Sequence, residues 1–198
     1  MPPLHGPNRG RPTPGHPRVE RTRSHILAVA RELLPVVGPA GLTYSLLAER
    51  AGVTRQTLYR HWPARAALLV DMILTGNTSG YPEPSPDPRA VATAWLTSMR
   101  GGLEDRAART AVLAVTAQAD ADPDSAQALA RLGADRLAAF NLLLAPSGLQ
   151  VGAEEYTMLV GPVLARLFFD RAEVTTEFID DVVSGWLATL RDRYDHCE

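Results

Sequence analysis

LTYSLLAERAGVTRQTLYRHWPARAALL, residues 42–69, is the stretch that decides the fold of this chain. Its hydrophobic spacing predicts two short helices, residues 44–51 and 55–62, with a tight turn between them. Gly52 lies where such a turn needs a positive φ angle, which glycine adopts without a steric penalty. The stretch therefore predicts two crossing helices joined by a short turn.

Side chains next to the turn support the same geometry. Thr43 and Thr54 each precede one predicted helix, where a threonine hydroxyl can cap the first turn. Val53 is expected to fill the space between the helices. Leu58 and Trp62, four residues apart, are expected to anchor the second helix in the core. Together these residues predict a helix-turn-helix.

The anchoring leaves one face of the second helix free for another molecule. Six side chains are predicted to be exposed there, all of them hydrogen-bond formers and none acidic: Arg55, Gln56, Thr57, Tyr59, Arg60 and His61. A short helix with such a face suits a DNA major groove, with its first residues at base edges and others at phosphates. Plain helix packing is the alternative interpretation of this geometry. The caps, the turn, the anchors and the exposed face all agree on DNA binding.

The same stretch resembles a known family. The run AGVTRQTLYRHWP, residues 51–63, with Arg65 and the leucine pair at 68–69, is similar to the TetR family of one-component repressors. The similarity covers about residues 21–73, and residues 161–187 resemble the last two helices of that family. Arginine stands at position 65 where a lysine is usual, which keeps the charge and adds a planar fork of donors.

The resemblance implies roles for individual residues. It places Thr43, Tyr59 and Arg65 at phosphates. It places the following residues near bases: Ser45, Arg55, Gln56, Thr57, Arg60 and His61. Tyr44 and Thr54 complete the DNA-binding set predicted for the helix-turn-helix.

The rest of the chain also has helical periodicity, and no strand alternation interrupts it. Helices are predicted over residues 18–34, 63–74, 88–100, 104–119, 123–144, 153–170 and 175–194. Pro35 is expected to end or kink the first helix, and residues 38–41 are expected to form a loop. Residues 76–88 contain four prolines and two glycines, which indicates a linker.

These patterns predict an all-α fold with three parts. Residues 1–17 are expected to be a disordered, basic, Pro/Arg-rich arm. Residues 18–66 are expected to form a three-helix, helix-turn-helix DNA-binding domain. A long helix would join it to a helical ligand-binding and dimerisation domain, residues 67–198.

Charge is distributed unevenly along the chain. Residues 1–66 carry ten Arg and three acidic residues, a net charge of +7, whereas residues 67–198 carry ten Arg and nineteen acidic residues, a net charge of −9. A basic head on an acidic body indicates a polyanionic partner for the head, although a solvated charge run is the simpler alternative. Arg9 and Arg11 flank a glycine as in an AT-hook, so they are predicted to contact DNA, either in the minor groove or only electrostatically.

The acidic body contains candidates for a ligand pocket and for a dimer interface. Isolated polar and large side chains between the predicted helices are the pocket candidates: Trp95, Met99, Thr116, Phe140, Asn141 and Met158. The last two helices have apolar bands wider than one core needs, which indicates a partner subunit. The predicted interface residues are Tyr156, Val160, Val163, Leu164, Leu167, Phe168, Phe178, Val182, Trp186 and Leu190.

Several classes of protein are disfavoured. The only cysteine is Cys197, so neither a disulfide framework nor a cysteine metal site is expected, and a reducing, cytoplasmic setting is indicated. No membrane span, signal peptide, metal motif or phosphate loop is recognisable, so no membrane partner, metal, cofactor or enzymatic activity is expected. An enzyme built from distant residues, and an adaptor whose basic head binds acidic protein or RNA, stay open as alternatives.

The sequence thus predicts a DNA-binding transcriptional regulator located at the nucleoid in the cytoplasm. The resemblance implies a repressor that binds a palindromic double-stranded operator as a homodimer. It also implies release by a small apolar or amphipathic inducer.

Overall fold

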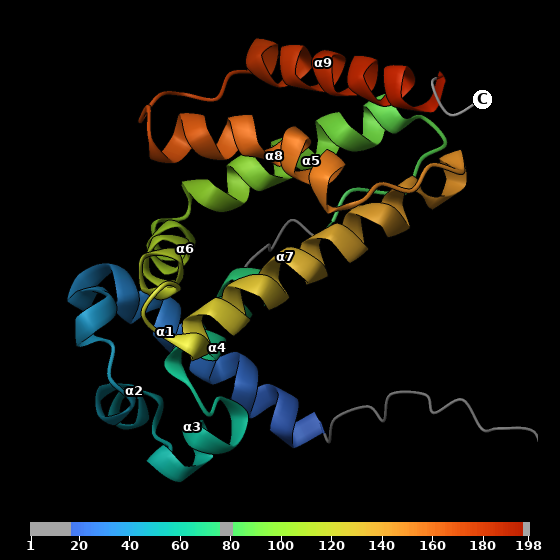
Figure 1. Cartoon of the computed structure of the whole chain (residues 1–198). Coiled ribbons are helices and arrows are strands. Elements are labelled where there is room, and N and C mark those ends of the chain that lie inside the picture. The colour runs from blue at the N-terminus through green and yellow to red at the C-terminus, as the bar shows by residue number, and fades with distance from the viewer. Residues whose placement is uncertain (1–16, 76–80, 196–198) are drawn as a thin grey trace, which may run out of the picture.

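The computed structural model describes residues 17–75 and 81–195, and every regular element in them is helical (Figure 1). The elements are α1 (Pro17–Gly41), α2 (Tyr44–Ala51), α3 (Arg55–His61), α4 (Arg65–Thr75), α5 (Pro88–Glu104), α6 (Arg106–Gln118), α7 (Pro123–Leu144), a 3-10 turn (Ala145–Ser147), α8 (Ala153–Phe168) and α9 (Thr176–Asp195). The predicted all-α fold is confirmed. Apart from α1, the predicted helix ends lie close to the observed ones.

Helix α1 departs from the prediction at its C-terminal end. It continues through Pro35 and breaks only at Gly38, where φ is 70° and ψ is 171°. Ala30 and Leu34 are completely buried on one face, and this packing stabilises the helix despite the backbone hydrogen bond that a proline removes. A further helical turn follows the break, and the amide of Leu42 donates to the carbonyl of Gly38 (3.1 Å). The predicted stop at Pro35 and the predicted loop at residues 38–41 are therefore wrong.

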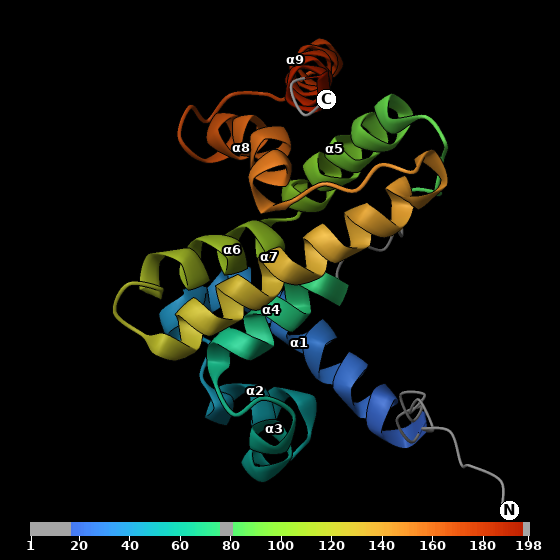
Figure 2. The ribbon, with the colours of Figure 1, turned by 45° about the vertical axis from the view of Figure 1, so that its right-hand side comes forward.

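The helices enclose two hydrophobic cores. The first joins α1–α4 to α6 and the start of α7, and the second joins α5, the end of α7, α8 and α9. Leu68 and Val70 of α4 are completely buried in the first core, so packing is continuous across residues 66 and 67. Helices α2 and α3 lie at one end of the molecule and α8 and α9 at the other (Figure 1, Figure 2).

A buried carboxylate connects the first core to helix α7. Asp71 of α4 is 4% exposed. Its Oδ2 accepts hydrogen bonds from Arg23 Nη2 of α1 (2.6 Å) and from Trp62 Nε1 at the end of α3 (2.6 Å). Its Oδ1 accepts one from Arg131 Nη2 of α7 (3.1 Å). This Asp71 cluster ties the end of α3 to a helix of the acidic body.

Candidate functional site

The turn between α2 and α3 has the geometry predicted from the sequence. Gly52 ends α2 in the left-handed conformation, with φ 63° and ψ 34°. The amide of Gly52 donates to the carbonyl of Glu49 (3.3 Å), and the amide of Val53 donates to that of Ala48 (3.0 Å). These bonds satisfy the last carbonyls of α2 and direct the chain into α3.

Both short helices begin at a threonine cap. Thr43 Oγ1 accepts a hydrogen bond from the amide of Leu46 (3.2 Å), and Thr54 Oγ1 accepts one from the amide of Thr57 (3.2 Å). The hydroxyls of Thr54 and Thr57 also share a hydrogen bond (3.0 Å). The first turn of α3 is therefore held before anything binds to it.

Tertiary contacts hold α3 in place. The helix has only seven residues, too few to be stable alone in water. Leu58 is completely buried and Trp62 is 1% exposed, so the helix is anchored at its middle and just after its end. The Tyr44 hydroxyl donates to the carbonyl of Trp62 (2.7 Å), and burial raises the pKa of Tyr44 to about 12. Tyr44 is therefore a neutral donor that fixes the end of α3.

One face of α2 and α3 is available to solvent. Apart from the capping threonines, the exposed members of the predicted DNA-binding set are Ser45, Arg55, Gln56, Tyr59 and Arg60. The ring of Tyr59, which is 55% exposed, packs edge-on against Tyr44 with a centroid distance of 4.8 Å. Since α3 contains no acidic residue, this face is polar and positively charged.

Other members of the predicted set are less accessible. Thr57 and His61 are half-buried, so the expectation that both would be exposed is wrong. The His61 ring lies 5.3 Å from the Trp62 ring, which turns it toward the core. Arg65 is half-buried, and its Nη1 donates to the carbonyl of Pro39 (2.8 Å). Its other guanidinium N–H groups remain as donors for a phosphate.

Arg9 and Arg11 lie outside the described residues.

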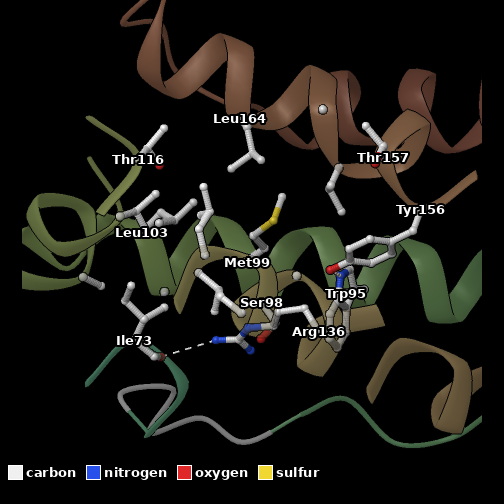
Figure 3. A pocket seen from close by; sticks show the side chains of 18 of the residues that line it. Ile73, Trp95, Ser98, Met99, Leu103, Thr116, Arg136, Tyr156, Thr157 and Leu164 are labelled. Carbon is white, nitrogen blue, oxygen red and sulfur yellow. Dashed lines mark hydrogen bonds between the residues drawn. The ribbon is translucent and has the colours of Figure 1, made fainter. Parts of the chain in front are cut away.

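A cavity of about 430 Å³ lies between α4, α5, α6, α7 and α8 (Figure 3). Of the predicted pocket residues, Trp95, Met99 and Thr116 line it. Its walls are mostly hydrophobic, and its size is within the range of sites that bind drug-sized molecules. Ile73 of α4 forms part of the cavity wall. It lies two residues after Asp71 in the same helix.

Three predicted pocket residues lie elsewhere. Phe140 is completely buried in the second core, where its ring packs against Trp95 at 5.4 Å. Asn141 accepts from the amide of Val151 (3.0 Å) and donates to its carbonyl (2.9 Å), so it joins two chain segments. Met158 is 42% exposed. None of the three lines this cavity: helix α7 turns Phe140 and Asn141 toward other neighbours, and Met158 faces solvent.

Tyr81 and Arg136 are among the cavity-lining residues that the sequence interpretation missed. Tyr81 lies within residues 76–88, which were interpreted only as a linker. Arg136 lies on α7 in a row with Leu129 and Leu132, which also line the cavity. A charged residue at helical spacing within an apolar row was the signal that could have identified it.

The C-terminal helix pair turns most of its predicted interface residues inward. Val163, Trp186 and Leu190 are buried in the second core, while Tyr156, Val160 and Leu164 line the cavity. Leu167, Phe178 and Val182 are half-buried beside this core, and Phe168 is also half-buried.

Trp186 in particular does not lie on the outer surface of the pair. It is 3% exposed, and its Nε1 donates to the carbonyl of Glu155 (2.9 Å). Within the single chain, Trp186 is therefore a core residue. Among the described residues of α8, α9 and the segment between them, the exposed large apolar side chains are Met158 and Phe169, the latter 85% exposed and directly after α8.

Within residues 17–75 and 81–195, no group of three or more His, Cys, Asp or Glu side chains is placed to hold a metal ion. No described helix combines the length and apolarity that a membrane span needs.

Comparison with known proteins agrees with this geometry. Residues 26–72 match the family described as "Bacterial regulatory proteins, tetR family". The uncharacterized HTH-type transcriptional regulator YdeS of Bacillus subtilis (strain 168) is 39% identical over 70 residues, which are 35% of this chain and 35% of that protein. The sequence match therefore spans about a third of that relative.

Solved structures extend the likeness over the whole fold. The TetR family transcription regulator SCO0332 is 26% identical, with a TM-score of 0.69 over 85% of this chain and 97% of that one. A TetR transcriptional regulator from Rhodococcus sp. RHA1, 22% identical, has the same fold, with a TM-score of 0.57 over 85% of this chain and 97% of that one. Residues 26–72 therefore match the DNA-binding domain of the TetR family, in which α2 and α3 form the helix-turn-helix, and the chain as a whole has the fold of solved TetR family regulators.

Proposed function

We propose that this protein represses transcription by binding a palindromic DNA operator as a homodimer, and that a small-molecule inducer releases it. The observation that carries the proposal is the exposed, acid-free face of α3 on a capped and anchored helix. Because this helix is already ordered, its binding in a major groove does not cost the conformational entropy of ordering it. Chromosomal operators would also place the working protein at the nucleoid, in the cytoplasm.

The roles of the exposed side chains follow from their positions. Arg55 and Gln56 begin α3, the end that contacts base edges in a helix-turn-helix. Guanidinium and amide groups at that end can form bidentate hydrogen bonds with guanine and adenine. Thr43, Tyr59 and Arg65 flank them and would bind phosphates, which position the protein without reading sequence.

Selection of bound duplexes from a random pool tests the proposal. The expected result is an enriched inverted repeat whose half-sites are separated by about one turn of DNA, roughly 34 Å. A pool without an enriched sequence, or with a single unrepeated half-site, would contradict it.

Replacing Arg55 or Gln56 by Ala is expected to relax specificity at particular base pairs, at a cost of about 1–3 kcal/mol per lost contact. Replacing Arg65 by Gln is expected to weaken binding to all duplexes similarly and to reduce the dependence on salt. Titration of the selected duplex and of single-base variants at several salt concentrations measures both effects. Arg106→Ala, at the exposed start of α6, is the matched control. Unchanged sequence preference in the Arg55 and Gln56 variants would show that another face reads the bases.

Removing residues 2–16 is expected to weaken operator binding, because Arg9 and Arg11 would no longer release counterions from the DNA. If Arg9 and Arg11 bind in the minor groove, a second result is expected. The loss should then be larger on duplexes whose flanks are A·T-rich, where that groove is narrow. Gel-shift titrations on A·T-rich and G·C-rich flanks measure the difference, and equal losses would leave a purely electrostatic arm.

Two-fold pairing is part of the proposal because one α3 contacts too few base pairs to specify a genomic site. The outer surface of α8 and α9 is the proposed interface. Met158, Pro162 and Phe169 are exposed on α8, and Gly185 and Ala188 are exposed on α9. Small residues allow close helix approach, and an exposed phenylalanine is a suitable anchor for a second copy of the chain.

The proposed inducer would act through α4. This helix contributes Ile73 to the cavity wall and Asp71 to the cluster that holds the Trp62 indole. A ligand that displaces α4 would therefore move the end of α3. Release from DNA requires that the ligand bind the DNA-free arrangement more tightly than the DNA-bound one.

A further inference from the structure

The cavity wall carries one positive charge that no carboxylate of the described residues neutralises. Among the described residues that line the cavity, Arg136 alone has a formal charge, and its guanidinium carbon lies 5.6 Å from the centroid of the Tyr81 ring. Its Nη1 donates to the Tyr81 hydroxyl (3.1 Å). Its Nη2 donates to the Ile73 carbonyl (3.3 Å), as Figure 3 shows. Both acceptors are neutral. No carboxylate of the described residues forms an ion pair with this guanidinium.

Two other arginines that contact α4 have carboxylate partners. Arg131, on the same helix as Arg136, pairs with Asp71 (3.1 Å) and lies 3.7 Å from the carboxylate of Asp135. Arg31 pairs with Asp105. Arg136 is half-buried among apolar side chains, where a charge without a counter-ion is costly. An anion in the cavity would supply the missing counter-ion.

A flat aromatic surface lies beside this charge. The rings of Tyr81 and Trp95 are stacked, with centroids 5.5 Å apart and planes inclined by 5°. Trp95 Nε1 donates to the Tyr156 hydroxyl (3.2 Å). Burial raises the pKa of Tyr156 to about 12, so this phenol stays neutral at physiological pH and adds no charge of its own.

We infer that the ligand of this cavity is an organic anion, with one carboxylate or similar acidic group bound to Arg136 and an apolar, preferably aromatic, body between α5, α7 and α8. The inference rests on the proposed function only for the consequence of binding. A carboxylate can take a two-pronged hydrogen bond from a guanidinium and would compete with the Ile73 carbonyl for Arg136. The anion would thereby act on α4 directly.

Other ligand classes fit the cavity less well. A cationic ligand would be repelled by the charge of Arg136, and the described residues that line the cavity include no carboxylate to bind it. A neutral apolar ligand would displace solvent from the guanidinium and leave the charge without a partner. Only an anion with an apolar body both fills the apolar space and neutralises the positive charge of Arg136.

Two fluorescent dyes that share a ring system test the inference: 8-anilinonaphthalene-1-sulfonate, an anion, and N-phenyl-1-naphthylamine, which lacks the sulfonate. The wild-type protein should bind the anion roughly 10- to 100-fold more tightly than the neutral dye, as expected for hydrogen bonds between charged groups. Arg136→Gln should remove most of this preference by weakening the anion alone. Arg106→Gln should retain it. Equal affinities in the wild-type protein, or a preference that survives in Arg136→Gln, would overturn the inference.

A second variant shows whether the dyes occupy the cavity. Gly161 lines it, and a Cβ at this position would meet no atom within 4 Å. Gly161→Leu should therefore fill the cavity without disturbing α8 and should weaken both dyes. Unchanged binding in this variant, with unchanged helicity by circular dichroism, would place the dyes elsewhere and overturn the inference.

Operator binding separates this inference from the proposed function. Arg136→Gln also removes the hydrogen bond to the Ile73 carbonyl of α4, so the operator affinity of this variant is measured without ligand and does not count for or against the ligand inference. The regulator proposal fails if no operator is selected, whatever the dyes do. The ligand inference fails on the dye affinities, whatever the DNA does.

Discussion

Replacement of Asp71 by Ala is expected to lower the free energy of unfolding by about 3–5 kcal/mol, the usual cost of removing one partner from a buried charge pair. The change would leave the guanidinium groups of Arg23 and Arg131 and the indole N–H of Trp62 without their shared acceptor. In a domain of this size, about 1 kcal/mol shifts the melting temperature by about 2–4 °C. Thermal and denaturant unfolding followed by circular dichroism would measure the loss.

Asp135→Ala is the matched control for this prediction. Asp135 is a half-exposed carboxylate, 48% exposed, that lies 3.7 Å from the same Arg131. Exposed ion pairs of this kind contribute about 0–1 kcal/mol, so this variant should melt close to the wild-type protein. If Asp71→Ala melts at the same temperature as Asp135→Ala, the Asp71 cluster is not a determinant of stability.

Replacement of Trp186 by Asp is expected to unfold the C-terminal core, whereas replacement of Phe169 by Asp should leave it folded and monomeric. Trp186 is 3% exposed and packs 6.0 Å from the Phe140 ring. Removing so large a side chain costs about 3–5 kcal/mol, and the new carboxylate would be buried without a partner. Phe169 is 85% exposed, so the same substitution there costs the single chain little.

Sedimentation and circular dichroism distinguish the two outcomes. The Phe169→Asp protein should keep wild-type helicity at room temperature, sediment as a monomer and lose most operator binding. Its melting temperature is a poor measure because dimerisation itself stabilises a folded protein in proportion to concentration. A folded Phe169→Asp dimer would place the interface on another surface. Wild-type helicity and melting in Trp186→Asp would contradict the burial of that side chain.

The helix-turn-helix could be predicted from the sequence because its determinants are local. Each capping threonine bonds an amide three residues later, in the next turn of its own helix. Gly52 needs only its own freedom to adopt a positive φ angle. Leu58 and Trp62 are one helical turn apart, so their common inward direction follows from helical periodicity. Interactions within a few residues are independent of how the rest of the chain packs.

Helix ends were predictable for a similar reason, with one exception. Pro35 and Gly38, three residues apart, are both possible ends of the first helix. Proline lacks an amide hydrogen and clashes with the preceding turn, so local sequence alone favours an end at Pro35. Packing of Val37 against the first core favours Gly38 as the break point, since the helix keeps its contacts as far as the glycine. The outcome depends on a core assembled from α1, α4 and α6.

The sequence by itself determined the helical class, the helix-turn-helix and the basic head on an acidic body. The tertiary structure decided which side of each apolar band faces inward. It turned Trp186 into the chain's own core, and it brought Tyr81, Trp95 and Arg136 together around one cavity. It also joined Asp71 to Arg131, sixty positions away along the chain. Helical periodicity states that a face is apolar but not which helix covers it, because that choice is made by side chains distant in sequence competing for the same surface.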